Sequence, residues 1–413
     1  MSVMMLLKKA KYVVLIVSLC VLLNLIAYAL PINEAFERNM ALSAETLHKE
    51  GKYPRILSQE LAQLDNFTDT IILGSAAYDG EESALVKLAA NYAPDKPYPD
   101  CLYNIYCTKT GGEYHRYSRY WHGYVFFVKS LLYFMSYGSI RQLNSFAQTA
   151  LYAIILVLFV KKKRTELVIP YTILWLFLNP AAVQASLQFS SVYYVFSIAT
   201  ILLLSMREKI KEHLGGGYSI FFMLIGIVTS WLDLLTYPIV TLGIPLTVLL
   251  LTENGSLKEK VKLLFLLSFM WACGYLGMWG FKWVLSSIIL GENIIQDAIN
   301  SARFRTSVSQ GELSWTRWDT IVKIMNCIQY KTYYVLFAVP LCYGIVKAVK
   351  NHTLLNWRDG VLCSMVSIMP FAWYIVLNNH SFIHYWFTYR SMGVAIFALS
   401  CFFVNGHRHD CKA

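Results

Sequence analysis

Charged side chains are scarce in this sequence. Asp, Glu, Lys and Arg make up 15% of its 413 residues, whereas a soluble globular domain usually contains about 25%. Hydrophobic residues make up 56%, and the mean hydropathy is +0.45. This composition excludes an ordinary soluble domain and is typical of an integral membrane protein.

The chain also lacks the signatures of common soluble enzymes. It has no Walker loop, no dinucleotide-binding glycine fingerprint and no GxSxG nucleophile elbow. It has no internal repeat either, so an inverted-repeat transporter finds no support. We therefore expect no nucleotide cofactor.

Basic residues outnumber acidic ones, 36 to 25, but they occur in blocks beside apolar segments. Lys161–Arg164, Arg207–Lys211 and Lys258–Lys262 each follow such a segment, and Lys8–Lys11 precede the first. The connections between these blocks have almost no Lys or Arg, as the positive-inside rule predicts for a multi-pass protein. We expect these blocks on the cytoplasmic side of a bacterial cytoplasmic membrane, against anionic lipid, and expect no nucleic-acid partner.

The apolar segments are long enough to cross a bilayer, which takes about 20 residues of helix. They lie near 12–30, 142–160, 166–184, 189–206, 218–236, 237–252, 262–287, 332–348, 360–377 and 388–404. An even number of crossings places both termini in the cytoplasm. The first segment is too long for a typical signal peptide, so we expect an uncleaved anchor.

The expected fold is all-α: a polytopic helical membrane protein with about ten transmembrane helices and a large outer loop carrying interfacial helices. Long loops in such a bundle are usually functional. The chain divides into the N-terminus and first helix (1–30), a large extracytoplasmic loop with an amphipathic helix (31–141), a transmembrane bundle (142–287), a second extracytoplasmic loop (288–331), and the C-terminal helices with a cytoplasmic tail (332–413).

Two cysteines lie close together in the large loop. Cys101 and Cys107 are separated by five residues, which does not match a CxxC zinc or redox motif. Because disulfides form outside the cytoplasm, we predict that these two cysteines are joined.

The segment from Glu113 to Tyr124 combines two His, two Arg and several aromatic residues. Arg binds phosphate through a bidentate fork, and aromatic faces stack on sugar rings or cations. The alternative is a belt of interfacial aromatic residues whose basic neighbours face lipid headgroups. We predict that the segment binds substrate through His115, Arg116, Arg119, Trp121 and His122.

A second polar segment lies between the last two apolar segments. If its backbone is helical, His380 and His384 share one face, at i and i+4, and can assist catalysis by hydrogen bonding to an anionic substrate. Two His at this spacing can also bind a divalent metal, but no third ligand is evident. Arg390 is costly near the membrane unless it is paired, and a substrate phosphate is a suitable partner.

Four acids are candidates for a general base that deprotonates an acceptor hydroxyl. Asp233 is the one acid in a long apolar stretch, followed by Tyr237, which we predict to bind substrate. The alternative for Asp233 is a helix-terminal acid in the headgroup layer. Asp69, Asp79 and Glu81 lie in the large loop, around a short β-like segment at 70–74, and the alternative for them is an ordinary solvated loop.

The layout of the chain resembles the GT-C class of integral membrane glycosyltransferases: a first span, a large outer loop with acids and an amphipathic helix, and then a many-span bundle. The blocks Tyr114–Tyr124, Asp233–Pro238 and Asn379–Arg390 also resemble stretches of uncharacterised multi-pass proteins of bacterial cell-surface polysaccharide systems. The GT-C resemblance implies a polyprenyl-phosphate sugar donor, transfer on the non-cytoplasmic face and a catalytic acid in the first outer loop. Glu34 has the expected position soon after the first span, but it lacks a paired acid.

We therefore expect sugar transfer from a polyprenyl-phosphate donor to a glycan or lipid acceptor at the cell surface, with membrane lipid, lipid-linked sugar and the glycan acceptor as partners. Three alternatives remain open at this point. One is a polysaccharide polymerase or ligase that uses the same lipid-linked chemistry. The second is a transporter or flippase of lipid-linked sugars, which needs polar residues at mid-membrane depth. The third is a non-catalytic scaffold in an envelope assembly.

Overall fold

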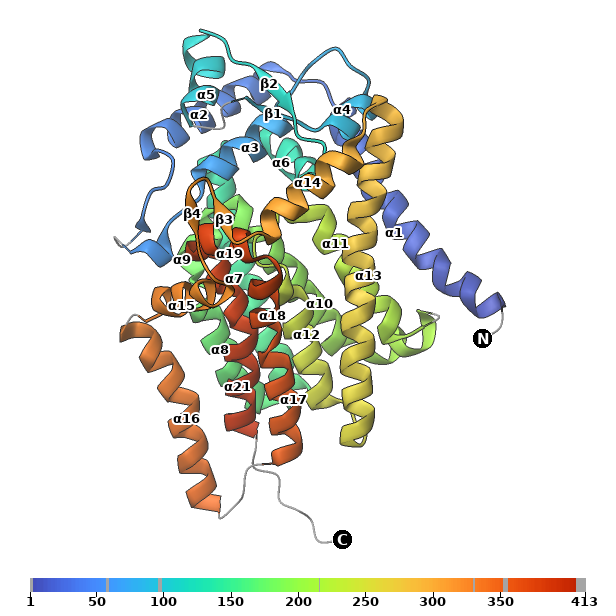
Figure 1. Cartoon of the computed structure of the whole chain (residues 1–413), viewed down its shortest axis with the longest axis vertical. Helices are drawn as coiled ribbons and strands as arrows, with labels where there is room; N and C mark the ends of the chain where they lie inside the picture. Colours follow the sequence, from blue (N-terminus) through green and yellow to red (C-terminus); the bar gives the residue numbers. More distant parts are fainter. Residues whose placement is uncertain are drawn as a thin grey trace.

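Long apolar helices dominate the computed structural model, which describes residues 3–56, 59–95, 99–214, 216–329, 331–351 and 356–405 (Figure 1). Among these residues, six helices are long and apolar enough to cross a membrane. They span 10–29, 137–161, 187–212, 257–290, 357–376 and 385–404. The chain is thus mostly helical, and these six helices support the predicted multi-pass membrane character.

The six segments correspond to α1 (Val3–Ala29), α7 (Tyr137–Lys161), α10 (Leu187–His213), α13 (Leu257–Leu290), the pair α17 (Trp357–Ser367) and α18 (Met369–Val376), and the pair α20 (Tyr385–Thr388) and α21 (Gly393–Asn405). Four further helices are apolar but shorter or less uniform. They are α8 (Val168–Phe177), α11 (Tyr218–Leu232), α12 (Ile239–Thr252) and α16 (Lys331–Asn351). α8, α11 and α12 lie within predicted spans, and α16 covers the predicted span near 332–348 and extends beyond it at both ends.

Short helices and a small sheet from the large loop gather at one end of the bundle, which we call the capped end (Figure 1). The helices are α2 (Glu34–Glu50), α3 (Asn66–Ala76), α4 (Ala84–Ala90), α5 (Pro99–Tyr103) and α6 (Tyr124–Leu132). The sheet pairs β1 (Tyr92–Pro94) antiparallel with β2 (Tyr114–Arg116), and Ala93 lies opposite His115.

The segment from 288 to 331 adds to the capped end. It forms α14 (Ile294–Thr306), a hairpin of β3 (Ser309–Gln310) and β4 (Leu313–Ser314), and α15 (Arg317–Cys327). Two further short helices, α9 (Pro180–Ala185) and α19 (Asn378–Ile383), connect longer ones. The helices α14 and α15 both contact α19, most of which belongs to the predicted block Asn379–Arg390. Elements distant in sequence therefore meet at the capped end.

The opposite end of the bundle, the basic end, is where α7, α10 and α12 finish and α13 begins (Figure 1). Its basic residues contact these helix ends. Arg164 and Arg207 both donate to the carbonyl of Thr252, and Lys260 donates to that of Leu250. Cations are favourable at helix C-termini, which have a partial negative charge.

Two sequence predictions are wrong. The segment 70–74 belongs to α3 and is not β-structure, because Asp65 caps this helix by accepting from the backbone N–H of Thr68 at 3.0 Å. The disulfide is not formed: Cys107 is a thiol whose sulfur donates to the carbonyl of Ala41 at 3.3 Å, so it is not joined to Cys101.

Candidate functional site

The turn after α11 is organised by Asp233. Both oxygens of its buried carboxylate accept from the backbone N–H of Thr236 at 3.1 Å, and the Thr236 hydroxyl donates to it as well. Within this turn Leu235 has a φ of +64°, the left-handed region that few non-glycine residues adopt. Asp233 is therefore engaged with its own turn, which it holds in a specific shape.

This turn presents the carbonyl of Leu235 to His380. Nε2 of His380 donates to that carbonyl at 2.6 Å, and Nδ1 accepts from Nη1 of Arg305 at 2.7 Å. Both imidazole nitrogens are thereby used. Burial, helped by the positive charge of neighbouring groups, holds the pKa of His380 well below its usual value, so this imidazole is neutral.

His384 lies next to His380, as the i, i+4 spacing predicts, with 4.8 Å between the ring centroids. Burial and then the charge of Arg305 lower the pKa of His384 to about 3, so it too is neutral. In the part of the chain that the structure describes, no three His, Cys, Asp or Glu side chains are placed to hold a metal ion. The charged group beside the two histidines is the guanidinium of Arg305.

Arg390 is fully buried in the turn that leads into α21. Its Nε donates to the carbonyl of Leu178 at 2.9 Å, and the guanidinium lies 4.4 Å from the ring centroid of Phe189. Nη1 has no hydrogen-bond partner among the described residues. A buried guanidinium with an unused donor is an expected binding point for an anion.

Tyr237 lies within electrostatic reach of both Asp233 and Arg390, and its hydroxyl donates to the carbonyl of Phe189 at 2.5 Å. The turn from Asp233 to Tyr237 thus contacts His380 through Leu235 and lies within electrostatic reach of Arg390 through Tyr237. We call this set the central polar cluster; its members are Asp233, Tyr237, Arg305, His380, His384 and Arg390.

The two arginines of the 113–124 segment are paired with acids. Arg116 forms an ion pair with Glu292, and Arg119 forms one with Asp297 at 2.8 Å. These pairs fasten the segment to the end of α13 and to α14. Nδ1 of His115 lies 3.6 Å from Asp95, beyond hydrogen-bond distance. Arg119 and Arg305 are both within electrostatic reach of the Tyr117 phenol.

Trp121 and His122 belong to the same segment and are buried. Nε1 of Trp121 donates to the carbonyl of Met278 at 2.7 Å, which fixes the segment to α13. His122 has a φ of +53°, pairs through Nδ1 with the hydroxyl of Tyr124, and has no partner for Nε2 among the described residues. Burial lowers its pKa to about 3, so it is a neutral imidazole with one unused nitrogen.

Asp69 is a helix cap in the structure. Its fully buried carboxylate accepts from the backbone N–H groups of Leu187 and Gln188, each at 3.0 Å, and from the hydroxyl of Tyr137. It thus satisfies the free donors at the start of α10, where a negative charge is favourable. Burial nevertheless raises its pKa above the usual range.

Asp79 and Glu81 are exposed on the turn between α3 and α4. Asp79 lies within electrostatic reach of Lys129 on α6. The structure therefore brings Asp233, Tyr237, His380, His384 and Arg390 together, and it leaves Asp79 and Glu81 on the surface of the capped end.

Sequence reasoning missed two residues that the structure makes prominent. Arg305 was one of several arginines in the 288–331 segment, and only the fold shows that it contacts His380. Asp65 is buried, and burial raises its pKa to about 7, although the hydrogen bonds from Thr68 act to lower that pKa. Asp65 is an Asp followed three residues later by Thr, a spacing that suits a helix cap, but burial cannot be read from that spacing.

An apolar groove of about 880 Å³ runs along the bundle between α1, α6, α7, α10 and α11. Tyr124, Leu187 and Trp231 line it at the capped end, and Lys209 and Leu214 line it at the basic end. These capped-end residues adjoin the central polar cluster and Asp69: Trp231 lies two residues before Asp233, and the Leu187 N–H binds Asp69. The groove thus ends at residues that are close in sequence to Asp233 or bonded to Asp69.

Comparison with known proteins gives no family for this chain. No family model matches it, and neither a curated protein nor a solved structure matches it.

Proposed function

We propose that this protein is a GT-C-like membrane glycosyltransferase that moves a sugar from a polyprenyl-phosphate donor to a glycan or lipid acceptor at the cell surface. The observation that carries the proposal is the apolar groove, whose lining at the capped end includes Trp231, two residues before Asp233, and Leu187, whose N–H binds Asp69. A polyprenyl tail is a long apolar chain, and a groove of this size and lining suits it. Its phosphate and sugar would then reach the capped end.

The charges of the cluster support a role in binding phosphate. Arg390 has an unused Nη1 donor, and Arg305 is oriented by a single bond to His380. Because both nearby imidazoles are neutral, the two guanidinium groups supply the positive charge. Such fixed cations stabilise the negative charge that develops on a leaving phosphate.

The base belongs among the buried acids of the same region. Asp233 is a member of the cluster, Asp69 binds the start of α10, and Asp65 lies within electrostatic reach of Asp69. Asp69 and Asp233 accept several hydrogen bonds each, whereas among the described residues only Thr68 donates to Asp65. Since the pKa of Asp65 is about 7, it exchanges a proton near neutral pH, as a general base must.

The topology is part of the proposal. The six long helices and the four shorter ones together make ten crossings. The basic end is then cytoplasmic by the positive-inside rule, both termini are cytoplasmic, and the capped end faces outward. The 31–141 segment forms the large outer loop.

A lipid-linked-sugar assay in nanodiscs, with native lipid extract as donor, tests the activity. Arg305→Ala should reduce transfer by at least 100-fold, about the loss seen when one charge-stabilising donor is removed. Arg303→Ala is the matched control, because Arg303 is exposed on the same helix and outside the cluster. Equal transfer by the two variants would remove the cluster from the site, and no transfer by the folded wild type would remove the activity.

A flippase of lipid-linked sugars is the second candidate, because the groove extends from the basic end to the capped end. Proteoliposomes loaded with a fluorescent polyprenyl-phosphate sugar distinguish the two. A flippase makes the inner-leaflet probe accessible to a membrane-impermeant quencher with no change in the sugar, whereas a transferase yields a new glycan.

A further inference from the structure

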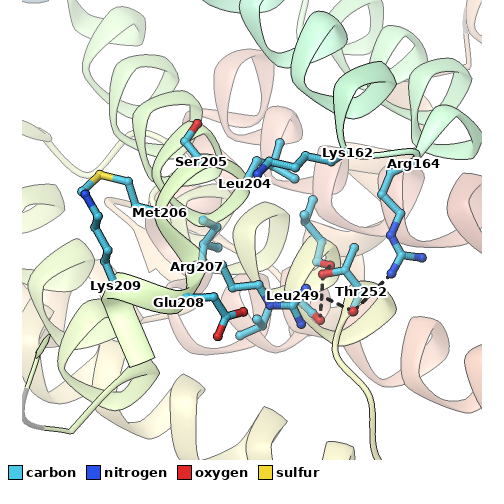
Figure 2. A pocket seen from close by; sticks show the side chains of 12 residues that line it. Lys162, Arg164, Leu204, Ser205, Met206, Arg207, Glu208, Lys209, Leu249 and Thr252 are labelled. Atoms are coloured by element: carbon cyan, nitrogen blue, oxygen red, sulfur yellow. Dashed lines mark hydrogen bonds between the residues drawn. The ribbon is translucent and has the colours of Figure 1, made fainter. Parts of the chain in front are cut away.

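The basic end contains a cavity of about 410 Å³ enclosed by the end of α7, the following loop, α10 and α12 (Figure 2). Four cationic side chains and one acidic one line it, together with apolar ones. The charged residues are Lys162, Arg164, Arg207, Lys209 and Glu208. The cavity is therefore amphipathic, with a net positive lining.

Two of the cations are held in place by the helix ends. Nη2 of Arg164 and Nη1 of Arg207 both donate to the carbonyl of Thr252, each at 3.2 Å, as Figure 2 shows. Arg207 also forms an ion pair with Glu253. Arg164 likewise has an acidic partner, since its Nη1 lies 3.5 Å from the carboxylate of Glu166. The charge of both arginines is therefore partly compensated, and the uncompensated positive charge of the lining comes from its two lysines.

The two lysines of the lining, Lys162 and Lys209, form no ion pair with an acid among the described residues. Lys211 pairs with Glu253 at 2.6 Å, but no ion pair or hydrogen bond involves the ammonium group of Lys162 or Lys209 in the part of the chain that the structure describes. Both are exposed at the mouth of the cavity. Their charge is available to a ligand.

A break in α10 joins this cavity to the apolar groove. Met206 leaves helical geometry, with φ −123° and ψ 22°, and residues 203–209 on both sides of it line the cavity. Met206 and Lys209 line the groove as well. A ligand with a charged group in the cavity therefore has an apolar surface directly beside it.

We propose that this cavity binds a phosphate group carried by an anionic membrane lipid, with the lipid tail against Met206 and the adjoining end of the groove. Clustered Lys and Arg next to a membrane helix bind acidic headgroups. The shared chemistry is phosphate, and a soluble phosphate ester is the other source. The apolar lining of Leu203, Leu204, Val248 and Leu249 favours the lipid. The site is independent of sugar transfer.

Native mass spectrometry of the full chain in detergent, titrated with dioleoyl phosphatidylglycerol, tests the proposal. The double variant K162Q/K209Q should weaken binding of the first lipid by about tenfold or more, at roughly 1 kcal/mol for each lysine. The matched control is K258Q/K262Q, which removes the same charge at the same end but outside the cavity. All four lysines are exposed, so both variants keep the fold.

Retained binding in K258Q/K262Q together with loss in K162Q/K209Q is the expected result. Equal loss in both variants would show general attraction to the basic end and would overturn the site, as would equal binding in all three proteins. A second titration uses inorganic phosphate and follows thermal stability. If stabilisation by phosphate depends on Lys162 and Lys209 while lipid binding does not, the lipid as carrier is overturned.

Discussion

Nη1 of Arg305 donates to Nδ1 of His380 at 2.7 Å, although 75 positions separate them in the sequence. His380 can accept this bond because its Nε2 donates to the carbonyl of Leu235, which fixes the tautomer. The imidazole is therefore a positioning group that aims the guanidinium of Arg305. It has no free nitrogen with which to act as a base.

If His380 acts through Arg305, the two residues should not contribute independently. His380→Ala and Arg305→Ala should each reduce sugar transfer strongly, and the double variant should be little worse than Arg305→Ala alone. Initial rates of the four proteins in nanodiscs give the double-mutant cycle. Multiplicative losses would mean that His380 has a role of its own.

Asp69 should be essential for stability and not only for activity. Asp69→Asn removes a charge that accepts bonds from Leu187, Gln188 and Tyr137, so we expect a loss of about 1.5–3 kcal/mol, the cost of a buried charged hydrogen bond. Thermal unfolding in detergent measures it. Asp79→Asn, on the surface, should change stability by less than about 0.5 kcal/mol. Equal stability of Asp69→Asn and Asp79→Asn would contradict the role of Asp69 as the cap of α10.

The sequence predicted the helices better than the roles of the polar residues. Apolar length marks a spanning helix wherever it lies, so the long helices were foreseeable. The role of a carboxylate depends on what the fold places around it. Asp69 is next to α10 only because of tertiary packing, and Arg116 meets Glu292 across 176 positions. Nothing local in the sequence encodes either contact.

Local chemistry was informative where partners are close in sequence. The i, i+4 spacing brought His380 and His384 together as predicted. Asp233 and Tyr237 lie in one turn, as their closeness in sequence implies, while the electrostatic reach of Tyr237 to Arg390 comes from the fold. The role of Arg305 was not predicted because its partner lies on α19, and an arginine on a helix looks the same in sequence whether or not it has such a partner.

α11 and α13 approach closely through two glycines, and this contact should be sensitive to a single methyl group. A Cβ at Gly274 would collide with the carbonyl of Met223, and one at Gly226 would collide with that of Trp271. Because backbone atoms cannot move aside, Gly274→Ala should destabilise the protein by about 1–3 kcal/mol. Thermal unfolding measures the effect.

Gly277 on the same helix provides the control, since a Cβ there meets nothing within 4 Å. Gly277→Ala should be neutral or stabilising, by up to about 1 kcal/mol, because Ala favours the helix. If the two alanine variants unfold at the same temperature, close packing at Gly274 is not required.

Asp65 should make the protein less stable as the pH rises towards neutrality. Burial raises its pKa to about 7, so the folded protein holds this proton more tightly than the unfolded chain, whose Asp ionises near pH 4. The free energy of unfolding therefore falls by up to about 4 kcal/mol between about pH 4 and 7, at 1.36 kcal/mol per pH unit, and is constant above that range.

Asp65→Asn tests this pH dependence, because it keeps an oxygen that can accept from the N–H of Thr68 but cannot ionise. Its thermal midpoint should exceed that of the wild type at pH 8, and the difference should shrink on acidification to pH 5. Parallel curves for the two proteins from pH 5 to 8 would mean that Asp65 is ionised throughout, and it could not then exchange a proton near neutral pH as a general base.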